Sequence, residues 1–198
     1  MVNFRFALCI LCPIITIGCN SNTNSITSPK TSTTNLDAQS DYLHANSPFQ
    51  LPVKINHIQR VSLNTHNASG TDVSGSYHWK NNNCKFIATY YFYPIPQNLM
   101  AAYPDSKTNK ILKLMYETTR DFIMNTPPKK ALISEKLVSQ NGSQGHETLY
   151  EMNQTTSVLR LYAVDNLWFL KHRYTYNKDC VTTVTPLIKT INQVVYLN

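Results

Sequence analysis

The chain has 198 residues with 18 lysines and arginines against 11 aspartates and glutamates, which gives a formal net charge of +7 at neutral pH. This excess is spread along the sequence and not gathered in one run, which argues against a nucleic-acid-binding arm and favours a solvated surface. Because the chain has only five glycines, it also has little room for the glycine-rich loops that bind phosphate.

The first 18 residues predict an export signal. Arg5 precedes an apolar run from Phe6 to Ile17, and the small residue Gly18 follows that run. Roughly 12 apolar residues are too few to cross a bilayer, which needs about 20. We therefore expect residues 1–18 to be removed and not to remain as a transmembrane helix.

Cys19 follows this signal directly. The run Thr16-Ile17-Gly18-Cys19 resembles a bacterial lipobox, although Thr16 stands where leucine is usual. The resemblance implies that Cys19 carries acyl chains that anchor the protein in the cell envelope. Asn20 in place of aspartate is similar to lipoproteins sent to the outer membrane, if the host is Gram-negative. The alternative is an ordinary secretory signal with Cys19 left as a free thiol.

Residues 19–48 contain the predicted lipidated cysteine and a stretch rich in serine, threonine and asparagine. A segment with so few apolar side chains cannot bury enough surface to offset the entropy lost on ordering. The composition therefore predicts a disordered tether, followed by a single domain over residues 49–198.

Two periodicities alternate in the rest of the chain. The segment 84–93 has the clearest strand pattern, because Phe86, Ala88, Tyr90 and Phe92 share one face. Other segments have apolar residues at the three- and four-residue spacing of a helix. In chain order, the predicted strands are 53–63, 73–79, 84–93, 131–140, 145–152, 157–164 and 167–176, and the predicted helices are 106–124 and 185–196.

This order predicts an α+β domain, in which two main helices pack on an antiparallel sheet of about six to seven strands, on one face or at both edges. Turn residues at Asn141-Gly142 and Asp165-Asn166 favour hairpins between the later strands. With the strands at 88–93 and 170–176, the arrangement resembles small bacterial envelope proteins of the PsbP-like kind. The resemblance implies a non-catalytic binding or accessory module.

Cysteine usage predicts one disulfide. Cys9 and Cys12 would leave with the signal and Cys19 would take the lipid, so Cys84 and Cys180 remain in the domain. Two such thiols in an exported protein usually form a disulfide. Cys84 begins one predicted strand and Cys180 follows the end of another, so the bond requires these strand ends to lie close together.

Aromatic and basic side chains on two predicted strands form the candidate binding surface. Alternation places Tyr91 and Tyr93 on one face of the first strand, where Lys171 and Arg173 of the other can join them. If this face is open, the four side chains suit a protein partner, a glycan or an anionic polymer. The alternative is that helices cover both faces and the rings belong to the core.

No motif names a reaction. Gly142 to His146 lacks the spacing of a nucleophilic serine elbow, and the six histidines lack the spacing of metal ligands. We therefore expect neither a metal nor a cofactor, and no enzymatic activity.

Two functional hypotheses remain. The leading one is a membrane-anchored envelope lipoprotein that binds another envelope or secreted protein as an accessory module. The alternative is a hydrolase that acts on cell-wall or surface substrates with residues from distant strands. A cleft with a histidine within hydrogen-bond reach of a carboxylate and a nucleophile would favour the hydrolase. The oligomeric state, and whether the domain faces the periplasm or the exterior, do not follow from the sequence.

Overall fold

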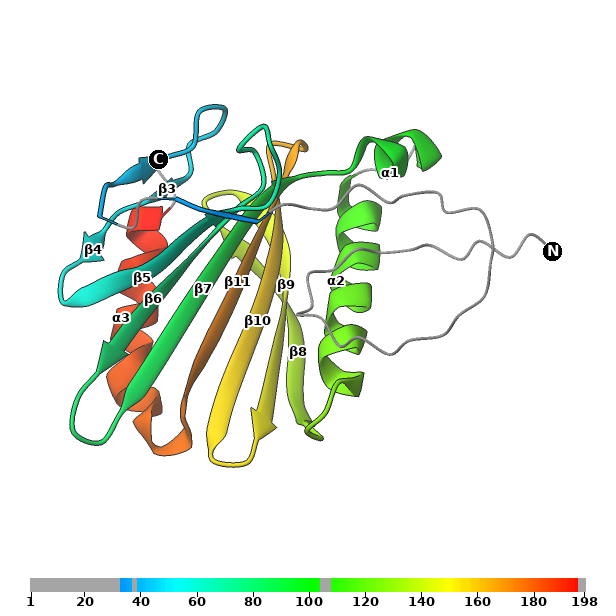
Figure 1. The fold of residues 1–198 in the computed structure, drawn as a ribbon. Helices are drawn as coiled ribbons and strands as arrows, with labels where there is room; N and C mark the ends of the chain where they lie inside the picture. The colour runs from blue at the N-terminus through cyan, green and yellow to red at the C-terminus, as the bar shows by residue number, and fades with distance from the viewer. Residues whose placement is uncertain (1–32, 37–38, 104–107, 196–198) are drawn as a thin grey trace, which may run out of the picture. The chain divides into compact units, whose positions relative to one another are not determined.

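A nine-stranded sheet is formed within residues 33–36, 39–103 and 108–195, the part of the chain that the computed structural model describes (Figure 1). Every strand pair in it is antiparallel. From one edge to the other the strands are β1 (Thr34–Asn35), β5 (Ile58–Thr65), β6 (Val73–Lys80), β7 (Lys85–Pro94), β11 (Trp168–Asn177), β10 (Thr155–Val164), β9 (Ser143–Met152) and β8 (Ala131–Gln140). Strand β4 (Lys54–Ile55) also pairs with β5, while β2 (Tyr42–Leu43) and β3 (Gln50–Leu51) form a separate ladder.

The α+β class is confirmed, but the predicted number of strands was too low. The sheet has nine strands among the described residues, and not six to seven. The additional strands, β1 and β4, have two residues each and are too short for the alternation that identifies a strand in a sequence.

Two helices cover opposite faces of this sheet. Helix α2 (Thr108–Asn125) packs on Leu161 and Phe169, so we call this side the α2 face. Helix α3 (Val181–Val195) packs on the other side, the α3 face, where Phe86, Ala88, Tyr90 and Phe92 are fully buried. The expected placement on one face or at both edges was therefore wrong, and the stated alternative, in which helices cover both faces, holds, because successive residues of a strand give each face its own apolar row. The described residues also form two short helices, α1 (Gln97–Ala102) and η1 (Lys178–Cys180).

Helix α3 begins four residues before the predicted start at Thr185. The chain passes from β11 through η1 directly into the helix, so Pro186 lies inside it and not at its first turn. The Thr185 hydroxyl donates to the Val181 carbonyl oxygen at 2.7 Å, one turn earlier. Proline is common in the first turn of a helix, and for this reason the sequence placed the start of the helix next to Pro186. In this helix the proline lies further along, so it did not mark the start.

The second part of the predicted tether belongs to the fold. The Arg60 side chain is 2% exposed and donates to the carbonyl oxygens of Leu51 and Ser40, while the Asp41 carboxylate accepts from the Val53 backbone at 2.6 Å. The His44 ring packs against Phe92 and Trp168, each at 4.9 Å between centroids. The ordered domain therefore begins before Phe49, because polar contacts order this segment and its composition does not reveal them. The predicted signal, Cys19 and Asn20 lie outside the described residues.

A disulfide joins Cys84 to Cys180 with 5.8 Å between the Cα atoms. Strands β7 and β11 are neighbours in the sheet, and the two cysteines lie just outside the same end of this pair. None of the helices in the described part of the chain is long and apolar enough to cross a membrane.

Candidate functional site

The four residues of the predicted binding surface lie together on the α2 face of β7 and β11. Lys171 pairs with Tyr91 across these strands, and the Lys171 Nζ lies 4.0 Å from the centroid of the Tyr91 ring and 5.9 Å from that of Tyr93. Arg173 follows on the same face and is exposed. The strand register therefore produces the aromatic and cationic cluster that the alternation predicts.

This cluster is less open than a bare sheet face would be. Tyr91, Tyr93 and Lys171 are all half-buried. Burial lowers the pKa of Lys171 to about 8, an effect that the Asp72 carboxylate opposes and that Arg173 reinforces. Because the ammonium group is desolvated and lies over the rings of its own chain, much of the cluster is already engaged and offers a partner only a small surface.

A serine and a histidine meet close to this cluster. The His66 Nε2 and the Ser74 Oγ lie 2.8 Å apart, while the His66 Nδ1 faces the Thr33 hydroxyl at 3.5 Å. Asp72 favours the protonated form of His66, but burial is the larger effect and lowers the pKa of this histidine. Both Ser74 and His66 are only 5% exposed. A nucleophile must reach its substrate, and in this structure the pair is buried.

Strand β8 is open to solvent along nearly its whole length, and it is the edge of the sheet next to β9. Three of its apolar side chains, Leu132, Ile133 and Leu137, are 49%, 51% and 76% exposed. Its outer side pairs with no strand among residues 33–36, 39–103 and 108–195. A long edge with exposed apolar residues is the kind of surface on which another extended chain can pair.

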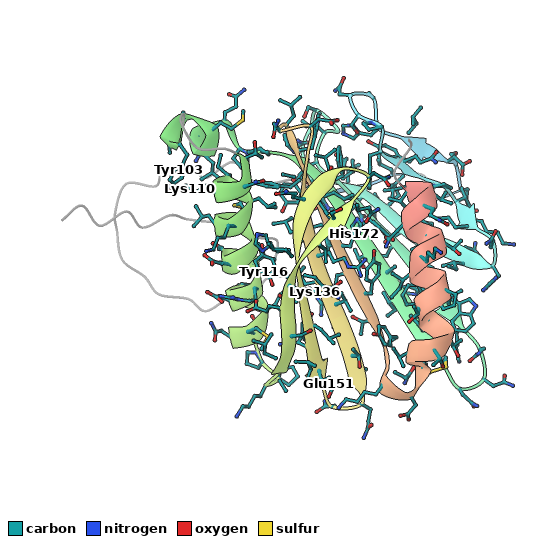
Figure 2. All side chains as sticks on the ribbon, turned by 180° about the vertical axis from the view of Figure 1, so that it is seen from behind. Tyr103, Lys110, Tyr116, Lys136, Glu151 and His172 are labelled. Carbon is teal, nitrogen blue, oxygen red and sulfur yellow. A yellow bond between two sulfur atoms is a disulfide. The ribbon has the colours of Figure 1, made fainter. Side chains whose placement is uncertain are left out.

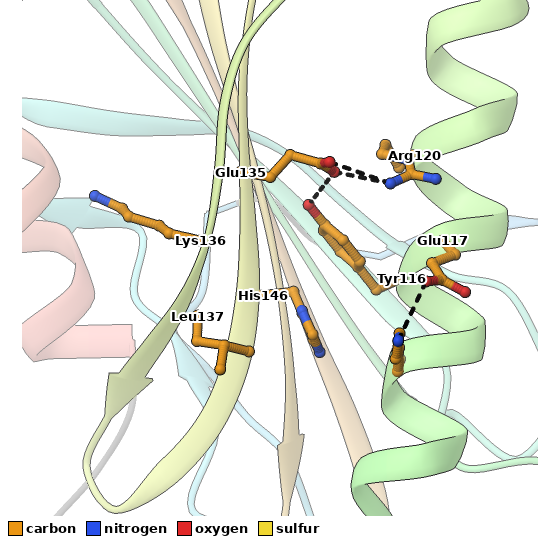
Figure 3. Close-up of a pocket in the computed structure, with 8 residues that line it drawn as sticks. Tyr116, Glu117, Arg120, Glu135, Lys136, Leu137 and His146 are labelled. Atoms are coloured by element: carbon orange, nitrogen blue, oxygen red, sulfur yellow. Dashed lines mark hydrogen bonds and ion pairs between the residues drawn. The ribbon is translucent and has the colours of Figure 1, made fainter.

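A hollow of about 260 Å³ lies on the α2 side of this edge, between α2 and strands β8 and β9 (Figure 3). At its centre, the Tyr116 hydroxyl donates to the Glu135 Oε1 at 2.9 Å and also hydrogen-bonds the Thr148 hydroxyl. The Arg120 guanidinium donates to the same Glu135 oxygen at 3.0 Å. The hollow is therefore built from polar groups that already hold one another in place.

These contacts set the protonation states in the hollow. Hydrogen bonding from Arg120 lowers the pKa of Glu135, and burial raises the pKa of Tyr116 to about 12. The His146 ring stacks on Tyr116 at 4.7 Å, and burial lowers the pKa of this histidine. At neutral pH we therefore expect an ionised Glu135, a neutral Tyr116 and a mostly neutral His146. None of these groups is an activated nucleophile, and Leu137 lies beside His146 at the mouth of the hollow.

A larger groove of about 520 Å³ lies on the other side of the same edge, between α3 and strands β8 and β10. Figure 2 views the molecule from behind and labels Lys136 of β8, one of the residues that line this groove. Lys136 and Leu137 line both hollows. Strand β8 thus has a free pairing edge with a hollow on each face, and this arrangement is the candidate site.

Glu135, Lys136 and Leu137 had not been singled out from the sequence. Their strand carries apolar and charged side chains on both faces, whereas a strand with one buried face alternates cleanly. Charged residues in the middle of a strand are typical of a sheet edge, and this signal could have identified β8.

No group of three or more histidine, cysteine, aspartate or glutamate side chains is placed to hold a metal ion within the described part of the chain. The absence of a cofactor stays a prediction from the sequence.

No family model and no curated protein matches this chain. Among solved structures, the solution structure of cyanobacterial PsbP (CyanoP) from Synechocystis sp. PCC 6803 is similar, with a TM-score of 0.46 and 12% sequence identity over 90% of this chain and 98% of that chain. This finding agrees with the weak PsbP-like resemblance of the sequence. A similarity at this level supports no inference about function.

Proposed function

We propose that this protein is a membrane-anchored envelope lipoprotein whose domain binds another envelope or secreted protein without catalysing a reaction. The lipobox-like run that ends at Cys19 supports the anchor. The open edge strand β8 is the single observation that carries the binding function. A partner would add an extended segment to this edge, with backbone hydrogen bonds for affinity and side chains in the hollow on the α2 face for specificity.

The occupant we propose is an extended, mainly apolar segment of a different protein. The two charges at the centre of β8 have partners within the chain, because Arg120 binds Glu135 and Glu147 lies 3.1 Å from the Lys136 Nζ. A partner segment therefore needs no charged residue to pair with β8, and its apolar side chains can contact Leu132 and Leu137.

A second copy of the chain fits this edge less well. A two-fold axis pairs residues that lie on the same face of the joined sheet. Two antiparallel registers would pair most of β8 with β8 of a second copy. In one of them Glu135 lies opposite Glu135 of the other copy, and in the other Lys136 lies opposite Lys136. Like charges directly opposite each other destabilise a strand pair.

The anchor is tested by the Cys19→Ala variant of the full chain. We expect the parent protein to sediment with membranes and the variant to appear in the soluble fraction, because the variant cannot accept the acyl chains. The measurement is the distribution of the protein between the two fractions. Unchanged association of the variant with membranes would contradict the anchor.

The docking edge is tested by photocrosslinking in cells that make the full chain with benzoylphenylalanine in place of Ile133. We expect one discrete adduct with a second protein, which mass spectrometry would identify. The additional substitution Leu137→Asp should lower the adduct yield about tenfold, as expected when an apolar contact worth about 1.5 kcal/mol is replaced by a carboxylate. Leu137 is mostly exposed, so folding stability should change by less than about 0.5 kcal/mol.

The matched control is Leu167→Asp, because Leu167 is also an exposed leucine, at 56%, but lies in the turn before β11. It should leave the adduct yield unchanged. An adduct with twice the mass of the chain would point to self-association, and an equal loss in both variants would contradict docking on β8.

A further inference from the structure

The groove on the α3 face, defined above by its position between α3 and strands β8 and β10, has cationic side chains on three sides. Lys136 comes from β8, Arg160 from β10 and Lys189 from α3. No aspartate or glutamate is among the described residues that line it. Glu147 lies beneath, 2.5 Å from the Arg160 Nε and 3.1 Å from the Lys136 Nζ, and offsets only one of the three charges.

Asn192 adds an uncharged donor to the same groove. Its Oδ1 accepts hydrogen bonds from the hydroxyls of Tyr90 and Tyr174, both of which are fully buried. The orientation of the amide is therefore fixed from within the core, and its Nδ2 hydrogens are the part left to donate. The Asn192 carbonyl oxygen also accepts from Gln140 at 3.3 Å, a contact that joins the tip of the β8–β9 hairpin to α3 at one end of the groove.

Apolar surface lies next to these donors. Ile188 of α3 and Val138 of β8 line opposite walls, and the Tyr162 ring forms part of the floor. The ring lies tightly on Gly145 of the neighbouring strand, where a Cβ atom would come within 2.5 Å of the Tyr162 Cδ1. The floor is therefore fixed by close packing, and it does not need a ligand to form it.

We propose that this groove binds a small organic anion, a molecule with a phosphate or carboxylate group that meets Lys136, Arg160 and Lys189 and an apolar portion that lies against Ile188 and Tyr162. Cations from three separate elements, with a fixed amide donor beside them, form an anionic-oxygen site, and such charge-assisted hydrogen bonds are the strong ones. A volume of about 520 Å³ suits a molecule of this size. The proposal is independent of protein docking on β8.

Isothermal titration calorimetry of the full chain in a non-ionic detergent tests this site with four soluble probes. Phenyl phosphate and benzoate each combine a ring with an anionic group, inorganic phosphate lacks the ring, and benzyl alcohol lacks the charge. We expect phenyl phosphate or benzoate to bind at least tenfold more tightly than benzyl alcohol, and the tighter of the two identifies the anionic group. Inorganic phosphate should bind more weakly than phenyl phosphate.

Two substitutions locate the binding in the groove. Lys189 is exposed and forms no ion pair within the described residues, so Lys189→Ala should weaken binding of the preferred probe at least fivefold without loss of folding. Asn192→Asp keeps an acceptor for the two tyrosines but places a carboxylate in the groove, and it should abolish binding. The matched control is Lys80→Ala, an exposed lysine on β6. The proposal is overturned if benzyl alcohol binds as tightly as the anions, or if Lys189→Ala and Lys80→Ala weaken binding equally.

Discussion

Replacing Cys84 and Cys180 together with alanine is expected to lower the free energy of unfolding by about 4 to 5 kcal/mol. The two cysteines are 96 residues apart in the sequence, so the bond closes a long loop and restricts the unfolded chain strongly. Both side chains are buried, at 7% and 3% exposure, so the variant also loses packing between the start of β7 and the start of α3. A domain is stabilised by only about 5 to 15 kcal/mol in total, and the loss would therefore be a large fraction.

Urea unfolding of the full chain, followed by circular dichroism, measures this loss. The parent protein treated with a reducing agent should lose slightly less stability than the double variant, because both have lost the covalent constraint but only the variant has lost the packing of the two side chains. The control is the double variant with and without the reducing agent, which should unfold at one urea concentration. A difference of less than about 1 kcal/mol between oxidised and reduced parent protein would mean that the bond does not restrict the unfolded state as its loop length implies.

The long elements of the fold could be predicted because each carries a complete periodic pattern. Strand β7 has four fully buried residues at every second position, and α2 was expected at 106–124 and lies at 108–125. The turns at Asn141-Gly142 and Asp165-Asn166 have the positive φ values that two-residue hairpins require. Local chemistry determines these features, so a single sequence contains them.

Features that depend on distant contacts could not be predicted in the same way. Strand β7 lies beside β11, whose residues come about 80 positions later, and no local pattern reports that pairing. The ordering of residues 39–48 depends on contacts that Arg60, Asp41 and His44 make with groups distant in the sequence. The long β8–β9 hairpin was visible in the sequence, but its place at the edge of the sheet depends on the order of all the other strands.

The same distinction between local patterns and distant contacts applies to the candidate site. Alternation correctly grouped Tyr91, Tyr93, Lys171 and Arg173, because residues two apart on paired strands share a face. Alternation does not report what lies above a face, so the sequence left open whether this cluster is exposed or covered, and the structure shows three of its four side chains half-buried. The two hollows beside β8 require α2 and α3 on opposite faces, an arrangement that only the folded chain fixes.

The second large effect that we expect is a dependence of the free energy of unfolding on pH, caused by His172. It lies fully buried on the α3 face between the rings of Tyr90 and Tyr162, at 4.6 and 5.4 Å between centroids. Its Nδ1 is hydrogen-bonded to the Tyr174 hydroxyl at 2.8 Å, while its Nε2 has no hydrogen-bond partner in the described part of the chain. Burial, reinforced by the positive charge of Arg160, lowers the pKa of His172 well below its ordinary value near 6.5.

The lowered pKa makes the folded state bind fewer protons than the unfolded state. Above about pH 6.5 the imidazole is neutral in both states and its contribution does not vary with pH. Below that value the His172 imidazole binds a proton in the unfolded chain but not in the folded chain. The free energy of unfolding should therefore fall as the pH is lowered from about 6.5 to 5, by about 1.4 kcal/mol per pH unit for this histidine alone.

The variant His172→Phe isolates this contribution. His44, His66 and His146 also have pKa values lowered mainly by burial, so the total slope contains their effects, and only the difference in slope reports on His172. Tyr174 keeps its hydrogen bond to Asn192 in the variant, so the fold should persist. Urea unfolding at several pH values between 5 and 6 should give the variant a slope shallower than the parent by up to about 1.4 kcal/mol per pH unit, and above about pH 6.5 the two slopes should converge. His78→Phe, at an exposed position on β6, is the matched control for the loss of an imidazole ring. Equal slopes in the parent and in His172→Phe would show that the buried ring accepts a proton in the folded state, and the tyrosines around it would then have to rearrange to provide an acceptor for the second N–H group.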